Sequence, residues 1–569
     1  MAHETAHEAA HEAPAAAREL VERHGATLES ALAALATRDY WSPHPESPRG
    51  YGEPVALDAL QDSELLLDQP GTDGRVGPDP EQGGETSPYG PPLRVAYPHA
   101  GDPGLLVAAA RAAQPAWAQA GPLVRAAVCC EILARINSRT PEVATAVMHT
   151  TGQAYGMAFP AGGPHAQDRA LEAVVCAYAE QTRLPGTAEW TKPQGKRDPL
   201  RMTKEFIPVP RGVALLIGCN TFPTWNGFPG LFASLATGNP VLVKPHPRAV
   251  LPLALTVQAA REVLLEAGFN PDLVLLAAEQ PGEGLARTLA LHPEVRIIDY
   301  TGSTVFGDWL EDNARQALVY TEKAGVNTIV VDSTDDYPGM LANLAFSLSL
   351  YSGQMCTTPQ NLLIPRTGIA TEAGPKSLDE VVTDLTGAID KLLGDDARAS
   401  ALLGAIVNPG VLERVERAGK GEYGTLALAP RAVVSAEFPQ ALIRTPALIR
   451  RDAGDGALPD ECFGPIAFAV AVDDTAQAVE LLRETVRERG AMTAAAYTTS
   501  PEVERAVVAA CLDAGVSLSL NLTGQVYVNQ TAAFSDLHGT GANPAANAAY
   551  CDAAFVASRF RVIEVRRHS

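Results

Sequence analysis

Short apolar runs of strand length alternate with helical stretches along the middle of this chain, beginning at Gly212. The first series of runs is GVALLIG, PVLVKP, LVLLAA, VRIIDY and NTIVVD. Between its second and third runs, the segment LALTVQAAREVLLEAGF repeats apolar residues at three- and four-residue steps and stops at Gly268. Because strands that alternate with helices pair in parallel, we expect a sheet with helices on both faces.

A second series of apolar runs follows Cys356: NLLIP, GAIVNP, AFAVAV, TAAAY, SLSLNL and VYVN. The two series predict two open α/β domains, with Cys356 shortly after their junction. Residues 105–184 have a helical pattern, whereas the polar residues 188–209 suit a projecting hairpin. The segment SRFRVIEVRR near the C-terminus is typical of an edge strand.

The charge balance argues against a nucleic acid partner. Lys and Arg number 44 against 66 Asp and Glu, and the resulting net charge of −22 repels phosphate backbones. The long uncharged run 212–243 is interrupted by prolines and asparagines, so it does not predict a membrane span. Residues 1–16 are rich in Ala, His and Glu, predict a disordered tail, and do not resemble a signal peptide. We therefore expect a soluble, cytoplasmic protein.

Eight cysteines are scattered along the chain, with no CxxC pair and no metal-ligand spacing. This usage is typical of a reducing compartment and predicts no metal site. Cys356, in YSGQMCTTPQ, is either a buried filler or a nucleophile. A thiolate that attacks a carbonyl requires a lowered thiol pKa, oxyanion donors, a base for the later water and an acceptor for the leaving electrons.

Two polar residues could serve the chemistry of such a thiolate. Asn220, in LIGCNTFP, follows a strand and is either an oxyanion donor or a turn residue. Glu322, in VYTEKAGVN, is either a general base or a surface carboxylate beside Lys323.

Other residues could hold the electron acceptor. Gly302 and Ser303 follow a strand and begin a helix, where backbone amides suit a pyrophosphate, although such junctions are often mere caps. Lys244 ends the strand VLVK, at the sheet edge where ligands bind in open α/β folds, or it faces solvent. Glu461, in DECFGP, is either a ribose ligand or a loop carboxylate.

In chain order these residues lie within motifs that resemble those of the aldehyde dehydrogenase superfamily. The family's Asn-Phe-Pro motif appears as CNTFP, its Ala-Thr-Gly-Asn as ATGN and its Lys-Pro as VKP. Its Thr-Gly-Ser appears as TGSTVFG, its Glu-Leu-Gly-Gly as EKAG, its nucleophile motif as GQMC and its Glu-X-Phe-Gly-Pro as ECFGP. The likeness runs from about residue 95 to 567, and seven motifs in order make it very specific.

The resemblance implies NAD(P)-dependent oxidation of an aldehyde to a carboxylic acid. It implies that Cys356 attacks the aldehyde, that Asn220 and the Cys356 amide stabilise the oxyanion, and that Glu322 activates water. It assigns four residues to the cofactor: Lys244, Ser303, Glu461 and Phe463. A CoA-acylating relative and a non-catalytic scaffold protein are the alternatives, and intact Cys356 and Glu322 count against them.

The resemblance also implies a division of the chain. The parts are a disordered tail (1–16), an N-terminal extension (17–94), an NAD(P)-binding domain (95–187 and 210–323), oligomerisation strands (188–209 and 557–569) and a catalytic domain (324–556). The oligomerisation strands imply a homodimer or a homotetramer.

Two departures from the family pattern bear on the site. Thr221 splits the Asn-Phe-Pro motif, which affects the pose expected of Asn220. NAD-preferring members often carry a glutamate three residues after the lysine, where this chain has Pro247. Loss of that carboxylate removes a repulsion against a 2′-phosphate, and Arg248 or His246 could supply positive charge. We therefore predict that NADP is preferred over NAD.

Several segments resemble the PaaN subgroup of phenylacetic acid degradation proteins: TRDYWSPHPESP, GGETSPYG, SGQMCTTPQN and HGTGANPAANAAY. This likeness implies an aldehyde of aromatic catabolism, such as the semialdehyde made when a CoA-linked ring is opened. Because no His stands near a Cys motif, cysteine-protease chemistry is not expected.

Overall fold

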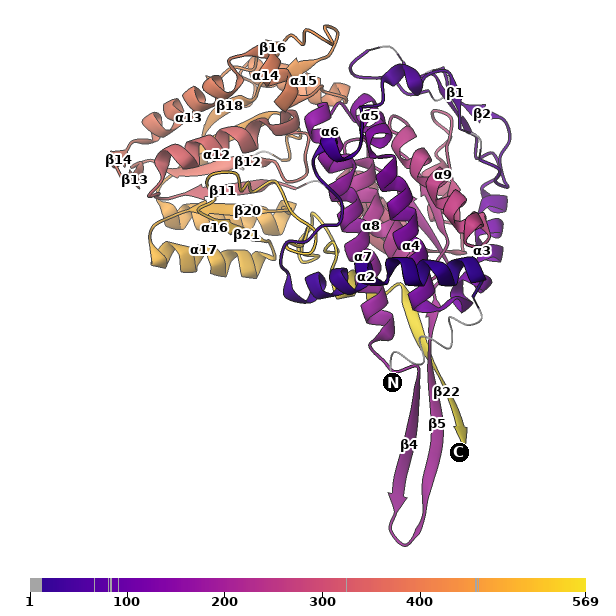
Figure 1. Ribbon diagram of the computed structural model, residues 1–569. Coiled ribbons are helices and arrows are strands. Elements are labelled where there is room, and N and C mark those ends of the chain that lie inside the picture. The colour runs from indigo at the N-terminus through magenta and orange to yellow at the C-terminus, as the bar shows by residue number, and fades with distance from the viewer. Residues whose placement is uncertain are drawn as a thin grey trace.

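The computed structural model describes residues 13–568 except 66, 80, 82, 83, 91, 324, 456, 457 and 459. Most of the predicted disordered tail lies outside the described residues, but its last two residues already belong to helix α2 (Ala15–Thr37). Two α/β domains lie side by side, and a long arm projects from one of them (Figure 1). The predicted fold class is therefore confirmed. Among the described residues, no helix is long and apolar enough to cross a membrane.

The first domain contains a parallel five-stranded sheet with the order β10-β9-β6-β7-β8. Its strands are β6 (Val213–Ile217), β7 (Val241–Lys244), β8 (Val274–Leu276), β9 (Val295–Thr301) and β10 (Leu318–Glu322). Ala214 and Leu216 of β6 share an apolar cluster with helices α8 (Pro223–Ala236) and α9 (Leu251–Glu266). Leu215 packs on the opposite face, with α3 (Pro103–Gln119), α10 (Leu285–Ala290) and α11 (Thr304–Asn313). A strand buried on both faces has to be apolar throughout, as β6 is.

The second domain contains a seven-stranded sheet with the order β15-β18-β19-β12-β11-β20-β21, parallel except for β15. Its strands are β11 (Asn327–Val331), β12 (Pro359–Pro365), β15 (Thr425–Leu428), β18 (Ala447–Asp452), β19 (Ile466–Val472), β20 (Ala494–Tyr497) and β21 (Leu518–Leu520). Helices α12 (Tyr337–Ser349) and α13 (Leu378–Leu393) cover one face, and α16 (Thr475–Arg489) and α17 (Pro501–Ala514) the other. NTIVVD, grouped with the first series, is β11 of this sheet.

Two of the predicted strands are wrong. GAIVNP is a loop because its backbone groups bond elsewhere: Ala405 N–H donates to the Gly152 carbonyl, and Val407 N–H donates to Gln354. VYVN is also a loop, and its carbonyl groups at Val526 and Asn529 accept hydrogen bonds from side chains. Side chains from distant segments thus satisfy backbone groups that a sheet would otherwise pair.

The N-terminal extension packs on the first domain. Helix α2 lies across α4 (Gly121–Ser138) and α7 (Pro164–Thr182) (Figure 1). Together with α5 (Thr140–Thr151) and α6 (Tyr155–Gly162), these two helices account for most of the helical pattern predicted for 105–184. After α2, His44 Nδ1 lies 2.7 Å from Asp168 Oδ1, and Ser42 donates to the same oxygen at 3.0 Å. These contacts hold the loop that carries Tyr40 and Glu46 against α7.

Smaller elements complete the chain. They are β1 (Ser63–Glu64), β2 (Arg75–Val76), β3 (Val95–Pro98), β13 (Ile369–Thr371), β14 (Gly374–Lys376), α14 (Asp396–Leu403), α15 (Pro409–Gly419), β16 (Ala432–Val433), β17 (Ile443–Arg444) and α18 (Ala553–Ala557).

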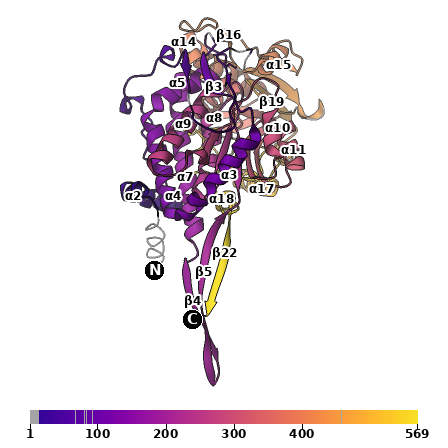
Figure 2. The ribbon, with the colours of Figure 1, turned by 90° about the vertical axis from the view of Figure 1, so that its right-hand side faces the viewer.

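The projecting arm is an antiparallel sheet with the order β22-β5-β4 (Figures 1 and 2). Its strands are β4 (Thr187–Gln194), β5 (Arg197–Pro210) and β22 (Phe560–His568). The C-terminal strand therefore returns to the hairpin of the first domain. Several apolar side chains of the arm are exposed: Leu200, Ile207, Val209, Val562 and Ile563.

A buried ion pair anchors the C-terminal segment where the arm begins. Arg559 is fully buried, and its guanidinium lies 2.8 Å from Asp299 Oδ2 in β9 and donates to Ser234 Oγ of α8 at 2.7 Å. The guanidinium also lies over the rings of Tyr320 and Phe555. One side chain thus joins the end of the chain to the five-stranded sheet and to α8, the helix that covers it.

We predict that Arg559→Met strongly destabilises the protein. Removing one partner leaves the Asp299 charge buried and uncompensated, at a cost of about 3–5 kcal/mol. Thermal and urea unfolding would measure this, and Arg559→Met/Asp299→Asn should recover part of the loss. Arg561→Met, at an exposed position of β22, is the matched control and should change stability by less than about 0.5 kcal/mol. Equal melting temperatures for Arg559→Met and the unmodified protein would contradict the prediction.

Candidate active site

A left-handed turn presents Cys356. Tyr351, Ser352 and Gly353 have φ angles of 53°, 49° and 62°, which are unfavourable for the two residues that carry a Cβ. A Cβ on Gly353 would lie 2.3 Å from the Gly464 carbonyl oxygen, so glycine is required there. The Ser352 hydroxyl donates to the Leu403 carbonyl at 3.1 Å and helps to hold the turn. The strain is typical of a functional site.

Asn327, at the start of β11, fixes the backbone of Cys356. Its side-chain nitrogen donates to the carbonyl groups of Cys356 at 2.8 Å and Thr358 at 2.9 Å. Its side-chain oxygen accepts from the amides of Met492 and Thr493. Sequence analysis did not single out Asn327, although an amide side chain within an apolar strand is a usable signal.

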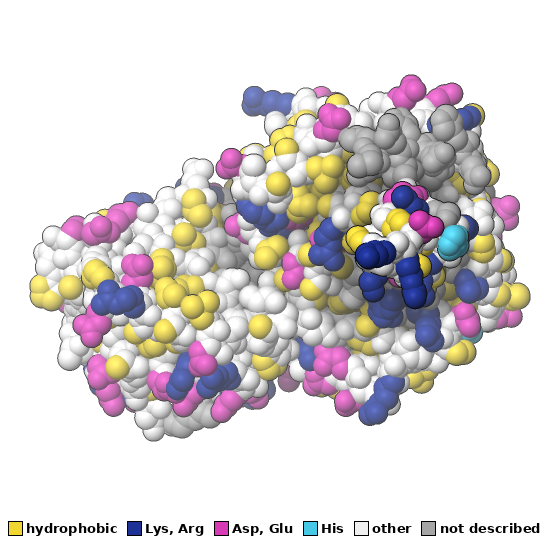
Figure 3. Space-filling model, turned by 90° about the horizontal axis from the view of Figure 1, so that it is seen from below, with side chains coloured by type: hydrophobic (Ala, Val, Ile, Leu, Met, Phe, Trp, Pro, Cys, Tyr) yellow, Lys and Arg dark blue, Asp and Glu magenta, His cyan; other side chains and the backbone are white. Residues whose placement is uncertain are grey.

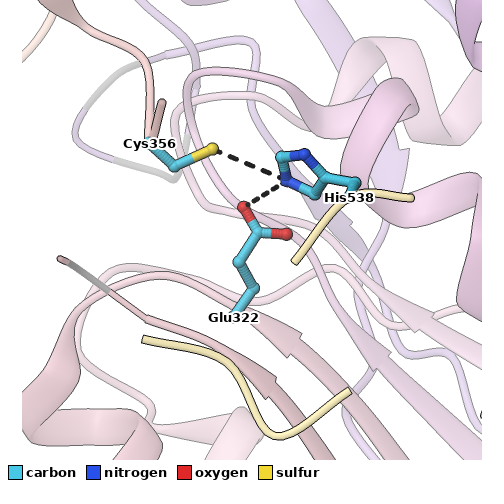
Figure 4. A group of neighbouring side chains, drawn as sticks. All are labelled: Glu322, Cys356 and His538. Carbon is cyan, nitrogen blue, oxygen red and sulfur yellow. Dashed lines mark hydrogen bonds and ion pairs between the residues drawn. The ribbon is translucent and has the colours of Figure 1, made fainter. Parts of the chain in front are cut away.

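Three side chains from distant segments meet at the thiol (Figure 4). Cys356 Sγ lies 3.7 Å from His538 Nε2, and that nitrogen lies 3.1 Å from Glu322 Oε1. Glu322 ends β10, and Asn226 of α8 donates to its other oxygen, Oε2, at 2.9 Å. The structure therefore brings the predicted base beside the predicted nucleophile.

His538 was not among the residues predicted from the sequence. No histidine lies near Cys356 along the chain, but the fold brings His538 beside it. The two residues are 182 positions apart. His538 exchanges backbone hydrogen bonds with Tyr550, and its ring meets Trp225 edge-on at 4.6 Å. The segment HGTGANPAANAAY contains both His538 and Tyr550, and its unusual composition was the available signal.

Burial and charge set opposite protonation states in this cluster. Burial raises the pKa of the Cys356 thiol well above its usual range, and the Glu322 carboxylate raises it further. Burial also pushes the pKa of Glu322 upward, but contacts with His538, Cys356 and Asn226 outweigh this and set it below the usual value. At neutral pH the base is ionised and the thiol is protonated. The lowered thiol pKa that catalysis requires therefore depends on a cation placed beside Cys356.

Asn220, the predicted oxyanion donor, already makes one hydrogen bond within the protein. Asn220 is half-buried and lines a cavity with Cys356, but its amide donates to the Thr150 carbonyl at 3.2 Å. The inserted residue Thr221 is held by Gln153, which donates to its carbonyl at 2.8 Å. Asn226 lines cavities on both sides of Cys356, so it is a second candidate that sequence analysis missed.

A cavity of about 1050 Å³ lies over the carboxyl ends of β6, β7 and β9. The predicted cofactor residues that line it are Lys244, His246, Gly302, Ser303, Glu461 and Phe463. Arg248 is exposed and is not among the described residues that line this cavity. The structure thus gathers these residues around one cavity, with the exception of Arg248.

The residues of this cavity fit a nicotinamide dinucleotide. Helix α11 begins there, and its first amides are not capped by the side chain of Ser303 among the described residues. A Cβ on Gly302 would lie 2.4 Å from the Tyr300 hydroxyl, so the approach to this helix end requires glycine. A helix N-terminus of this kind suits a pyrophosphate.

Charges around the predicted cofactor residues differ from expectation. Lys244 is buried and pairs with Glu279, a residue after β8 that sequence analysis missed. Burial, with Lys244 and Arg248 nearby, lowers the pKa of His246 to about 4, so this ring is neutral at physiological pH. Burial raises the pKa of Glu461 to about 7, although the Gly325 amide opposes this.

A second cavity, of about 530 Å³, reaches Cys356 from the other side. Large apolar and aromatic side chains line it: Met157, Phe222, Trp225, Phe346, Leu350 and Tyr527. Tyr40 and Glu46 of the N-terminal extension also line it, with Asp168 and Asp536. None of the described residues that line this cavity is Lys or Arg.

Known proteins are similar to this chain over most of its length. The model of the aldehyde dehydrogenase family matches residues 94–541. The crystal structure of an NAD-dependent aldehyde dehydrogenase from Burkholderia multivorans is similar, with 53% sequence identity and a TM-score of 0.92, over 97% of this chain and 99% of that chain.

Two curated relatives are more distant. An N-succinylglutamate 5-semialdehyde dehydrogenase of Chromobacterium violaceum is 26% identical over 392 residues, which are 67% of this chain and 73% of that protein. The bifunctional protein PutA of Klebsiella aerogenes is 25% identical over 347 residues, 58% of this chain but 25% of that protein, so this chain spans only a part of PutA. The chain therefore belongs to the aldehyde dehydrogenase family and is an NAD(P)-dependent oxidoreductase that acts on aldehydes.

Proposed function

We propose that this enzyme oxidises an uncharged, largely apolar aldehyde to a carboxylic acid through a thioester on Cys356. The observation that carries the proposal is the position of Cys356, which lines both an apolar cavity and the cofactor cavity. Glu322 lies in the same cluster, as a base for thioester hydrolysis requires.

The proposed roles follow from the atoms at the cluster. Cys356 loses its thiol proton to solvent, Sγ attacks the aldehyde carbon, and the oxyanion accepts hydrogen bonds from the Cys356 amide and from Asn220 or Asn226. A nicotinamide cofactor would supply the hydride acceptor there, held by residues such as Lys244, Ser303 and Glu461. Glu322 then takes a proton from the water that attacks the thioester, and the acid leaves with the thiolate restored. Asn226 orients Glu322 throughout, because it holds one carboxylate oxygen.

The charges of the smaller cavity support an uncharged substrate. Glu46, Asp168 and Asp536 are carboxylates, and the described lining residues offer no Lys or Arg to a substrate anion. A CoA thioester or a second carboxylate would lack a cationic partner there. The aromatic lining and the PaaN-like segments support an aldehyde of aromatic catabolism, and a CoA-linked semialdehyde is the alternative substrate.

The other two candidate functions have less support. A CoA-acylating enzyme has no need for a carboxylate base beside its thioester, whereas Glu322 is buried and held in place. A scaffold protein has no need for a strained turn that presents a thiol to two cavities.

The central test is aldehyde-dependent reduction of NAD and NADP by the purified protein. The panel contains phenylacetaldehyde, benzaldehyde, acetaldehyde, succinic semialdehyde and a CoA-linked semialdehyde, and we expect the uncharged aromatic aldehydes to give the highest kcat/KM. Cys356→Ala should lose at least about 10³-fold in kcat, whereas Cys219→Ala, a neighbouring thiol, should retain turnover. Glu322→Gln should give one burst of reduced cofactor and a steady rate lowered about 10²-fold or more. Turnover by Cys356→Ala, or a preference for the CoA-linked aldehyde, would contradict the proposal.

The cofactor preference is better supported for NAD than for the NADP predicted from sequence. Arg248 does not line the cofactor cavity among the described residues, and His246 is neutral. Glu279 is likewise absent from the described lining of this cavity, but its carboxylate pairs with Lys244, which does line it, and from there the charge would repel a 2′-phosphate. The Burkholderia relative is described as NAD-dependent. We therefore propose that Glu279 replaces the carboxylate lost at Pro247.

This proposal predicts that Glu279→Gln shifts selectivity toward NADP. Removing the repelling charge should raise the NADP to NAD ratio of kcat/KM by about tenfold, equivalent to ~1.4 kcal/mol. Arg248→Ala should leave the ratio unchanged. A collapse of NADP use in Arg248→Ala, with no effect of Glu279→Gln, would instead support the sequence-based prediction.

The pKa of Glu461 predicts how cofactor affinity depends on pH. Because this pKa is raised to about 7, the carboxylate is ionised above pH 7 and becomes protonated as the pH falls below it. A protonated carboxyl is a poorer acceptor for ribose hydroxyls, so the Kd for the cofactor should rise by up to about tenfold per unit below pH 7. Fluorescence titrations from pH 5.5 to 8.5 would measure this. Glu461→Gln should bind weakly with a flat profile, and a flat profile for the unmodified protein would exclude this role.

We further propose that the arm joins copies of this chain into a homodimer or homotetramer. Its exposed apolar side chains, such as Ile207 and Ile563, lack the burial that a second copy would provide. Lys and Arg side chains gather on the arm, which faces the viewer in Figure 3. Because the chain carries a net charge of −22, the acidic body of a second copy complements this basic arm.

A further inference from the structure

We propose that Cys356, His538 and Glu322 form a binding site for Zn²⁺, and that the bound ion reversibly blocks the thiol. One sulfur, one imidazole nitrogen and one carboxylate oxygen are ligands that zinc accepts. The inhibitory effect rests on the proposed role of Cys356 as the nucleophile, whereas binding of the ion does not.

The ligand atoms already lie at nearly the required separations. Zinc bonds of about 2.3 Å to sulfur and about 2.0–2.2 Å to nitrogen and oxygen place tetrahedral ligands roughly 3.4–3.6 Å apart. In the structure, Sγ lies 3.7 Å from Nε2, and Nε2 lies 3.1 Å from the carboxylate oxygen Oε1. All three ligand atoms lie within 4.8 Å of one another, so the ion requires shifts of a few tenths of an ångström in the two nitrogen contacts and a matching approach of the carboxylate oxygen to the sulfur.

One carboxylate oxygen in the cluster has no hydrogen-bond donor among the described residues. Glu322 is 2% exposed, and its Oε1 accepts no hydrogen bond from any described residue, despite its short distance to His538. Asn226 satisfies Oε2 and thereby fixes Oε1 toward the thiol. Because this oxygen has a charge contact with His538 but no hydrogen bond within the described part of the chain, a bound cation would give it a stronger partner. Asn226 would act as the outer partner that orients a metal ligand.

The charges of the cluster also suit a divalent cation. Coordination releases the thiol proton to solvent, so a thiolate and a carboxylate together neutralise the charge of Zn²⁺, and His538 binds as neutral imidazole. No oxidant or reductant is needed. Because the Sγ lone pair then bonds the ion, it cannot attack a carbonyl.

The site has access and an open fourth position. Cys356 and His538 line the smaller cavity, and Cys356 and Glu322 line the larger one. The ion could therefore enter from the substrate side, and solvent could complete its coordination. The sequence indicates no metal site because these ligands have no metal-ligand spacing along the chain. Their proximity arises only from the fold.

Cobalt provides a direct test, because Co²⁺ takes the same ligands and is coloured. The full chain, freed of metal and reductant, would be titrated with Co²⁺. We expect one equivalent to give a thiolate-to-cobalt charge-transfer band and tetrahedral visible bands, and Zn²⁺ to displace them. Cys356→Ser should abolish the charge-transfer band, and His538→Phe, which preserves ring packing on Trp225, should weaken binding at least tenfold. His538→Gln provides a second variant if the first does not fold.

Matched controls separate this site from others. Cys219→Ser removes a neighbouring thiol and His246→Gln removes another cavity histidine, and both should retain the full cobalt spectrum. Zn²⁺ should also slow alkylation of Cys356 by iodoacetamide and inhibit aldehyde oxidation, with EDTA restoring both. Absence of the cobalt–thiolate band in the unmodified protein, or an unchanged band in the His538 variants, would overturn the proposal. A cobalt spectrum in a protein that oxidises no aldehyde would overturn the proposed function and leave the metal site supported.

Discussion

The buried pair between Arg559 and Asp299 is the interaction on which the arrangement of the molecule depends. A fully buried guanidinium has to be paired, and Asp299 lies within β9, just before the Gly302-Ser303 turn. Arg559 also contacts α8, the helix that carries Asn226. The C-terminal segment is thereby fixed to β9, which leads into the cofactor cavity, and to α8, whose Asn226 holds Glu322. The loop with His538, which precedes this segment, is brought to the thiol by the same return of the chain.

The electrostatics of the cluster keep the Cys356 thiol protonated unless a cation binds beside it. Burial and the Glu322 carboxylate keep Cys356 protonated, while His538 and Asn226 keep Glu322 ionised. A positive charge placed beside the sulfur would favour the thiolate. Two cations would have opposite effects on the sulfur. The oxidised cofactor would activate the sulfur for attack, whereas a divalent metal ion would bind it and block the attack.

The N-terminal extension has a role that its composition did not indicate. The hydrogen bonds of His44 and Ser42 to Asp168 hold the loop after α2 against α7, and this loop brings Tyr40 and Glu46 to the smaller cavity. The residues that line this cavity therefore come from both domains and from the extension. The acidic and aromatic character of this cavity is a property of the assembled surface, and no single segment shows it.

The sequence by itself determined the fold class, because apolar runs that alternate with helices leave few solutions other than two parallel sheets. It also singled out Cys356, Glu322, Lys244, Gly302 and Ser303 as candidates, because short motifs of neighbouring residues around them resemble those of one family. It could not locate His538, Asn226 or Glu279, whose partners are distant in the chain. It also misjudged GAIVNP and VYVN, whose strand-like composition was overridden by side-chain hydrogen bonds such as those of Gln354 and Asn343. Only the tertiary structure decided these contacts, because burial and charge pairing act between residues that meet in space regardless of their separation along the chain.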